Sequence, residues 1–322
     1  MKTIKLSGFA LALALSIGLL MSCGSDDDSP APLPPIGGFS SSDEVKGTDL
    51  ISKWSFEDNI TDSKSNNPGI PTNVAYTAGA KGKAWDGSST QPRYAIYNGA
   101  TSIGALNSFT FAFWMNTANT VPNTDIPEQG KGTQGIFSLV KPNEFWGAIN
   151  LFLENQNTEF PNKLRVKLLI ENERSGVTWQ SQSPVVNIDN KLNTWIHVAF
   201  TYNATTSKMS AYVDGQPAGS IDGAYSPDGG YAGSYTVFGN DPGGIANPNN
   251  APLWGALDFG GSYSQVVLGS HQFTTTPSLT STHGAESWST NFAGKLDEFR
   301  IYKTALSSSD IGSLYELEKA GR

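Results

Sequence analysis

The sequence predicts an all-β fold, a two-sheet antiparallel β-sandwich of the jelly-roll type with a short C-terminal helix. Three observations predict it. Apolar and polar residues alternate with a period of two over several runs, as they do in half-buried strands. Polar turns separate these runs, and the chain contains 34 glycines and 18 prolines. No helical pattern stands between the runs, which argues against a parallel sheet with crossover helices.

Alternation is clearest in the middle of the chain. Residues 109–115 place large apolar side chains on one face: Phe109, Phe111, Phe113 and Met115. Residues 164–171 place an apolar face opposite a mixed one that consists of Arg165, Lys167, Leu169 and Glu171. Residues 195–202 and 209–213 read as two strands of a hairpin, and Asp214-Gly215 marks the next turn. Near the C-terminus, Ser307 suits a helix N-cap, and Ile311, Leu314 and Tyr315 form a stripe that predicts a helix over residues 307–317.

Residues 1–22 form a targeting segment rather than part of the fold. Lys2 and Lys5 precede an apolar run over residues 9–21, which is shorter than the roughly 20 residues that span a bilayer. Leu20-Met21-Ser22-Cys23 resembles the bacterial lipobox, in which the signal peptide is removed before a cysteine that then carries lipid. Cys23 is the only cysteine in the sequence. We therefore expect a lipid anchor at Cys23 rather than a buried free thiol.

The chain continues with an acidic run and a linker. Asp26-Asp27-Asp28 resembles the export signal with which some Gram-negative bacteria place lipoproteins on the outside of the outer membrane; a solvated linker is the alternative. Residues 23–47 are poor in apolar groups, and we expect a disordered tether there. Residues 48–322 then form the folded domain. The net charge of −8, without a Lys/Arg cluster, argues against nucleic acid as a partner and leaves the lipid as the membrane contact.

Five segments together carry a family resemblance: 50–58, 81–87, 109–114, 193–215 and 292–307. In this order they resemble laminin-G-like domains of the concanavalin A-like lectin/glucanase superfamily, which implies two packed sheets, one of them concave. The stretches 215–266 and 271–290 are longer than that family pattern requires. Long loops in a compact domain are often functional, and these two are rich in aromatic residues.

A catalytic site is not apparent. The glucanase patterns E-x-D-x-x-E and E-x-D-x-E are absent, and the adjacent Asp297 and Glu298 would point to opposite faces of a strand. Glu171 and Glu173 share a face close to Arg165 and Lys167, although solvated charges at a strand end are the simpler interpretation. The histidines form no triad or metal pattern: His197 reads as structural, and His271 and His283 are far apart in sequence.

Sugars stack on flat aromatic faces while planar polar groups bind their hydroxyls. Trp54, Trp85, Trp114 and Trp195 fall in predicted core strands. The remaining tryptophans either line a glycan site or are buried under loops. If they converge on the concave sheet, we expect glycan contacts from the following residues: Trp146, Trp179, Trp254, Trp288, Tyr231, Asn150, Arg165, Lys167 and Glu171.

The resemblance also implies a structural Ca²⁺, held by Asp297 with Glu57, Gly87 and Asp58 nearby; the alternative is that Asp297 caps an edge or pairs with Arg300. Together, these features predict a non-catalytic, cell-surface, carbohydrate-binding lipoprotein that serves partner glycosidases or transporters of the outer membrane. Two alternatives stay open: a glycoside hydrolase with a displaced carboxylate pair, and a protein-binding adhesin or subunit of a membrane complex.

Overall fold

The computed structural model describes residues 32–119, 132–154, 162–173, 184–218, 233–237 and 253–322, together with the backbone of residues 179–181. Residues 1–22, Cys23 and the acidic run lie outside the described residues. The chain divides into the units Met1–Pro34 and Pro35–Arg322, and only the second is described below. Among the described residues no helix has the length and apolar character needed to cross a membrane.

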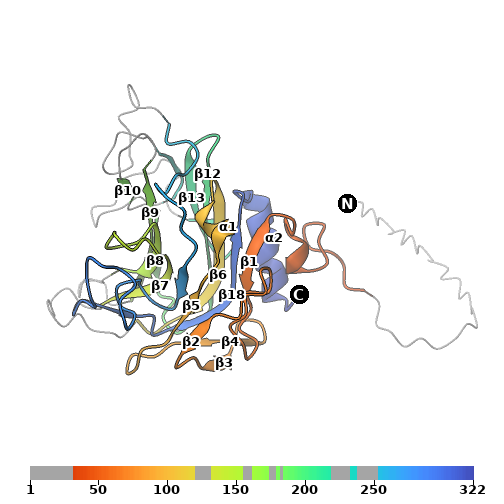
Figure 1. Ribbon diagram of the computed structural model, residues 1–322. Coiled ribbons are helices and arrows are strands. Elements are labelled where there is room, and N and C mark those ends of the chain that lie inside the picture. The colour runs from red at the N-terminus through yellow and green to blue at the C-terminus, as the bar shows by residue number, and fades with distance from the viewer. Residues whose placement is uncertain are drawn as a thin grey trace, which may run out of the picture. The chain divides into compact units, whose positions relative to one another are not determined.

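The second unit consists of two stacked sheets, as Figure 1 shows. The first sheet has the order β14-β13-β12-β6-β18-β4-β3, with β1 paired to β18 and β15 paired to β13. Its strands are β1 (Leu50–Trp54), β3 (Tyr76–Ala78), β4 (Lys83–Asp86), β6 (Phe109–Asn116), β12 (Ile196–Asn203), β13 (Lys208–Val213), β14 (Gln216–Pro217), β15 (Tyr235–Thr236) and β18 (Lys295–Tyr302).

The second sheet has the order β10-β9-β8-β7-β16-β5-β2, with β11 paired to β9 and β17 paired to β7. Every pairing is antiparallel except that of β17 with β7. The predicted antiparallel sandwich is therefore confirmed. The strands are β2 (Ile70–Thr72), β5 (Tyr94–Tyr97), β7 (Thr133–Leu139), β8 (Ile149–Leu153), β9 (Lys163–Asn172), β10 (Trp179–Ser181), β11 (Val185–Asp189), β16 (Val266–Leu268) and β17 (Ser289–Asn291). A short helix, α1 (Thr101–Gly104), links β5 to β6.

The main core lies between the sheets, and the alternating runs form it as predicted. The apolar residues of β6 and β9 that share a face are all buried in this cluster. Phe299 of β18 lies at its centre: its ring centroid is 5.2 Å from that of Phe113 on the same sheet and 5.7 Å from that of Phe137 on the opposite sheet. Phe299 therefore joins the two layers of the sandwich.

A β-bulge at Glu298 brings Phe299 into the core. The register between β18 and β6 shifts between Asp297 and Arg300, and Glu298 has a positive φ of 44°. One extra residue reverses the alternation, so Leu296 and Phe299 both face inward. The prediction that the carboxylates of Asp297 and Glu298 point to opposite faces is wrong for this reason. The Glu298 carboxylate instead accepts a hydrogen bond from Arg300 on the outer face, at 2.5 Å.

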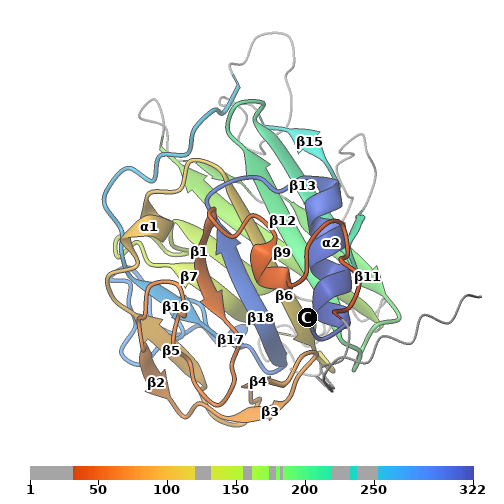
Figure 2. The ribbon, with the colours of Figure 1, turned by 90° about the vertical axis from the view of Figure 1, so that its right-hand side faces the viewer.

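Helix α2 (Ser308–Lys319) covers the outer face of the first sheet (Figure 2). The predicted N-cap is confirmed, because Ser307 and Asp310 form a reciprocal capping box. Apolar residues of the helix pack with side chains of five strands in a second buried cluster, whose members are Val45, Leu50, Ala112, Ala199, Tyr212, Tyr302, Leu306, Ile311, Leu314 and Leu317.

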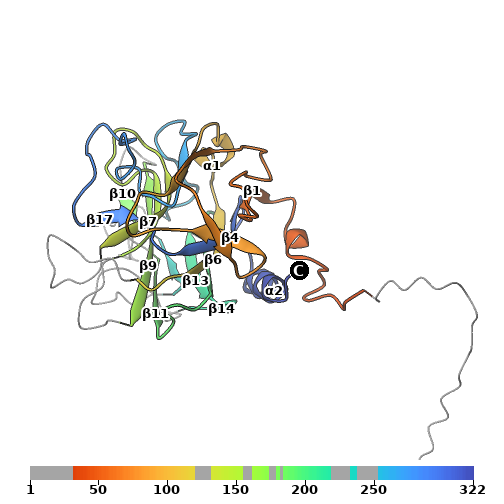
Figure 3. The same cartoon turned by 90° about the horizontal axis from the view of Figure 1, so that it is seen from below.

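The N-terminal segment packs beside α2 and corrects the predicted boundary of the tether. Val45 is fully buried, and Ile36 and Phe39 pack against the same cluster as α2. The 3₁₀ turn η1 (Ser42–Glu44) brings Asp43 within 2.6 Å of the Arg300 guanidinium. The packed region thus begins near residue 36 rather than 48, because the apolar side chains of Ile36, Phe39 and Val45 pack in the same cluster as α2. Figure 3 shows this segment on the α2 side, away from β7 and β9.

Replacing Phe299 by Ala should remove the contact between the layers and lower the free energy of unfolding by about 3–5 kcal/mol. Denaturant unfolding followed by tryptophan fluorescence measures this change. Ile70→Ala, at a position that is 55 % exposed, is the matched control, and a comparable loss there would contradict the assignment.

Candidate functional site

The outer face of the second sheet carries polar side chains at alternate positions of β8 and β9. Asn150 lies opposite Leu169, and Phe152 lies opposite Lys167. Because side chains two residues apart share a face, Arg165 and Glu171 lie on this face too, and all four predicted polar residues are buried there. The alternation along β9 predicted one face for Arg165, Lys167 and Glu171, and the register between β8 and β9 adds Asn150 to it.

Seven rings cover this face, and we call them the aromatic platform: Phe145, Trp146, Phe152, His271, Phe273, His283 and Trp288. Trp146 stacks on Phe152 at 5.4 Å and meets Trp288 at 5.7 Å, between ring centroids. Phe145 stacks on Phe273 at 4.3 Å. Phe152 and Phe273 are buried, whereas Phe145, Trp146 and Trp288 are partly exposed. The platform therefore has a buried base and four rings that a ligand can reach, because His283 is exposed as well.

The loop between β7 and β8 carries Phe145 and Trp146. Gln272, which follows β16, holds this loop in place. The Gln272 side chain is fully buried. Its carbonyl oxygen accepts from the Lys141 amide at 2.9 Å, and its amide nitrogen donates to the carbonyl oxygens of Lys141, Glu144 and Phe145 at 2.5–3.2 Å. One added stretch, residues 271–288, thus fixes the loop that carries Phe145 and Trp146.

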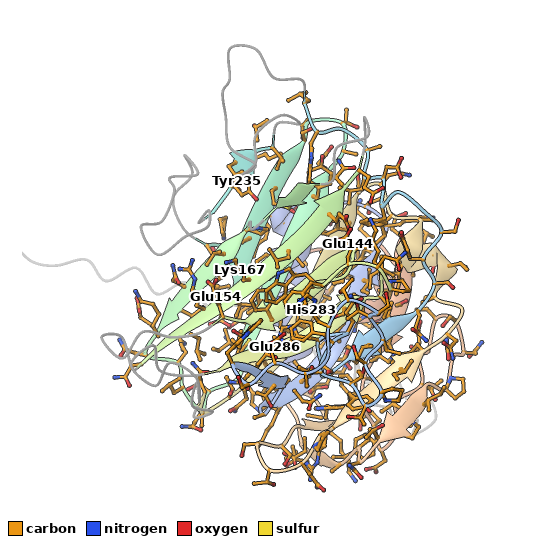
Figure 4. The ribbon with its side chains drawn as sticks, turned by 60° about the vertical axis from the view of Figure 1, so that its left-hand side comes forward. Glu144, Glu154, Lys167, Tyr235, His283 and Glu286 are labelled. Atoms are coloured by element: carbon orange, nitrogen blue, oxygen red, sulfur yellow. The ribbon has the colours of Figure 1, made fainter. Side chains whose placement is uncertain are left out.

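Two charged groups flank the platform. In the first, Glu154 pairs with both Arg165 and Lys167, and Figure 4 shows Glu154 beside Lys167 with Glu144 at a distance. In the second, Lys141 pairs with Glu171 at 2.8 Å and also with Glu173. The prediction that Glu171 and Glu173 lie close to Arg165 and Lys167 is therefore only partly right. The face is shared, but Lys141 from the neighbouring loop binds both carboxylates.

Burial dominates the electrostatics of the second group. It raises the pKa of Glu171 to about 7, because hydrogen bonding and charge attraction from Lys141 offset only part of the cost of desolvation. The nearby Glu144 and Glu173 carboxylates raise this pKa further by repulsion. With Glu144 included, the second group thus combines three carboxylates with one ammonium group among the described residues.

Comparison with known proteins identifies the family. A family model described as the concanavalin A-like lectin/glucanases superfamily matches residues 89–267, more than half of the chain. The chain belongs to this superfamily. No curated protein matches the sequence.

Solved structures with low sequence identity resemble this superfamily member in fold. Domain 4 of AbnA, an extracellular GH43 arabinanase from Geobacillus stearothermophilus solved with arabinotriose, is 18 % identical, with a TM-score of 0.46 over 82 % of this chain and 97 % of that one. The binding domain of botulinum neurotoxin serotype D/C VPI 5993 is 16 % identical, with a TM-score of 0.49 over 84 % of this chain and 52 % of that one. The present chain therefore spans about half the length of the toxin domain.

The structure places the tryptophans predicted to contact a glycan in different parts of the domain. Trp146 and Trp288 lie together on the platform. Trp254 does not: it is 4 % exposed and packs in the main core against Tyr202, at 5.8 Å. The backbone of Trp179 pairs with Asn172, while its side chain and Tyr231 lie outside the described residues.

Sequence reasoning missed most of the platform. Phe152 alternates with Asn150 along β8, and this period of two was a usable signal. His271 and His283 were set apart because of their separation in sequence. In the structure His271 stacks on Phe273 at 4.8 Å and His283 meets Phe145 at 4.5 Å. Lys141 and Glu144 precede β8 in a loop whose position no local pattern predicts.

The predicted calcium ligands are partly used by other partners. Asp297 is fully buried, its Oδ2 accepts from the Lys81 amide at 2.9 Å, and a Cβ placed on Gly79 would overlap this oxygen. A buried carboxylate behind a glycine suits a hard cation. Asp58, in contrast, pairs with Lys83 at the surface, Glu57 accepts from the Lys83 amide, and the Gly87 carbonyl accepts from Arg93. Calcium at Asp297 stays a prediction with one fitting ligand.

Acid should destabilise the domain through its buried histidines. Burial lowers the pKa of His271 and of His197 to about 3, below the unfolded value near 6.5. The unfolded chain therefore binds more protons, so stability that is present above about pH 6.5 is lost as the pH falls towards 3. Each histidine should contribute a slope of about 1 kcal/mol per pH unit.

Unfolding in denaturant between pH 7 and 4 measures this slope. His271→Gln, which keeps an amide for Asn150, should reduce the slope relative to the wild type. His283→Gln is the control, because His283 is exposed. Equal slopes in the wild type and His271→Gln would show that His271 does not stay neutral in the folded state.

Proposed function

We propose that this domain binds a glycan across the aromatic platform on the outer face of the second sheet. The observation that carries the proposal is the contact of partly exposed Trp146 and Trp288 above a row of planar polar and charged side chains. Flat rings offer large contact area to the C–H faces of a sugar at little cost in conformational entropy. The partly exposed Glu154 carboxylate, which Arg165 and Lys167 hold in place, would accept hydrogen bonds from hydroxyls.

The preformed base of the platform favours binding. Trp146 lies on Phe152, and Phe152 belongs to a central strand, so the ring does not need to be ordered by the ligand. A surface that is ordered before association keeps more of its contact energy as affinity. The charged groups at the two ends, Glu154 with Arg165 and Lys167, and Lys141 with Glu171 and Glu173, are different in net charge. They would give a bound oligosaccharide a preferred direction.

We favour binding over hydrolysis because of the position of Glu171. A glycosidase needs an acid and a nucleophile that both reach the scissile bond. Glu171 is fully buried, and its Oε1 is bound to Lys141. The carboxylate that the sequence suggested as catalytic is thus directed into the protein.

We further propose that Cys23 carries lipid and holds the domain at the outer surface of the cell, where it delivers glycan to glycosidases or transporters. The packing of residues 36–45 beside α2 supports a simple presentation. Residues 36–45 pack against the first sheet's side of the domain, so they leave the aromatic platform on the second sheet uncovered.

Trp146→Ala and Trp288→Ala should each weaken glycan binding by about tenfold or more, which corresponds to the loss of about 1.4 kcal/mol. A glycan array on residues 24–322 would identify the ligand, and titration calorimetry would measure the affinities. Tyr315→Ala changes a half-buried ring on the opposite side of the domain, against Trp114, and should leave binding unchanged. An array without any ligand, or unchanged affinity in both tryptophan variants, would refute the proposal.

Cys23→Ser should abolish incorporation of labelled fatty acid and release the protein from the membrane fraction. Metabolic labelling with a palmitate analogue, followed by fractionation, measures both effects. Ser22→Ala is the neighbouring control, since a small residue remains before the cysteine. Unchanged labelling in Cys23→Ser would contradict the lipid anchor.

A further inference from the structure

We propose that Glu144, Glu171 and Glu173 bind a divalent cation of the hard, oxygen-preferring class, such as Ca²⁺. Carboxylate oxygens of the three residues lie within 4.8 Å of one another. They come from two segments, the loop after β7 and the end of β9. Hard cations take oxygen ligands, with carboxylates foremost. The site lies on the opposite sheet from Asp297 and does not depend on the calcium expected there.

One carboxylate oxygen of this cluster is buried without a partner among the described residues. Glu171 is fully buried, and its Oε2 has no hydrogen-bond partner among the described residues, while Oε1 binds the Lys141 ammonium. A buried carboxylate oxygen without a partner is costly, because the hydrogen bonds it made to water are not replaced. A cation beside Oε2 would supply the missing interaction.

Lys141 is the resident counter-charge of the cluster. Its ammonium contacts Glu171 and Glu173, donates to the Phe259 carbonyl oxygen at 3.1 Å and lies 5.5 Å from the centre of the Tyr263 ring. Among the described residues, one ammonium group faces the carboxylates of Glu144, Glu171 and Glu173, so negative charge remains whenever all three are ionised. A divalent cation would complete the neutralisation, and the ammonium nearby would limit its affinity by repulsion.

Backbone hydrogen bonds fix the position of Glu173. The Glu173 amide donates to the Asp258 carbonyl oxygen at 2.7 Å, and the Asp258 amide donates to the Asn172 side chain at 2.9 Å. Gly260 has a φ of 72°, and a Cβ there would overlap the Glu173 carboxylate. The loop after residue 257 therefore leaves room for this carboxylate only because residue 260 is glycine.

A cation at this site would join the end of β9 to the loop that begins at Lys141. Glu144 directly precedes Phe145 and Trp146, so the ion would also steady the exposed rings of the platform. The cation site itself does not rest on glycan binding, because its occupancy can be measured without any sugar.

The test uses residues 24–322 carrying Asp297→Asn, so that no ion at Asp297 contributes. Tb³⁺ luminescence excited through nearby aromatic rings reports binding, and displacement by Ca²⁺ gives its affinity. Glu171→Gln and Glu173→Gln should each weaken Tb³⁺ and Ca²⁺ binding by about tenfold or more. Lys141→Met, which keeps the length of the side chain, should strengthen binding because it removes the repulsion.

Glu154→Gln is the matched control, because Glu154 is already paired with Arg165 and Lys167 at the other end of the face. It should leave the affinity unchanged. Absence of Tb³⁺ and Ca²⁺ binding, or equal effects of Glu154→Gln and Glu173→Gln, would overturn the proposal. Near-ultraviolet circular dichroism checks folding. If Glu171→Gln does not fold, partly exposed Glu173 and the gain expected from Lys141→Met still decide the question.

Discussion

The packing of the whole sandwich depends on the β-bulge at Glu298. The bulge lets strand β18 pair within the first sheet, place Phe299 in the core and place Arg300 against α2. Without the extra residue, strict alternation would place Phe299 outside whenever Leu296 is inside. With it, Phe299 reaches between the sheets and meets Phe113 and Phe137, while Arg300 turns outward beneath α2. The positive φ of Glu298 is a local cost of order 1–3 kcal/mol, which burial of a phenylalanine offsets.

Arg300 connects the bulge to η1 and to helix α2. Its guanidinium is fully buried and donates to Glu318 of α2 at 2.6 Å, to Glu298 at 2.5 Å and to Asp43 at 2.6 Å. Burial raises the pKa of Glu318 to about 7, and the Arg300 charge opposes this rise. Isolated buried charges would be unfavourable, but a fork-shaped guanidinium satisfied by three carboxylates recovers much of the desolvation cost. The N-terminal segment thus becomes part of the domain.

The sequence was informative wherever a local period carried the signal. The alternation in β6 and β9 predicted both faces of each strand, and the capping residues at Ser307 predicted the start of α2. The same local reasoning failed at Glu298, because a bulge changes the face of a residue without changing the pattern of residue types. It also failed for Trp254, since a tryptophan in a long Gly- and Asn-rich stretch can equally fill a gap in the core. The charged groups depended on Lys141, whose position only the folded loop determines.

The location of the candidate site follows from how the two outer faces are used. On the first sheet, α2 and residues 36–45 cover small and apolar side chains such as Ala112 and Ala199, so that face is occupied by the chain itself. On the second sheet, no helix among the described residues takes this role. Polar and charged residues alternate with the core positions there, and residues 271–288 cover only part of the face. Their rings build a platform on Phe152, and Gln272 fixes the loop that carries Phe145 and Trp146. Ordering a long loop costs conformational entropy. Contacts of His271 and Gln272 with Asn150 and the loop at Lys141 offset this cost. The same contacts leave the upper rings, Trp146 and Trp288, partly open to a ligand.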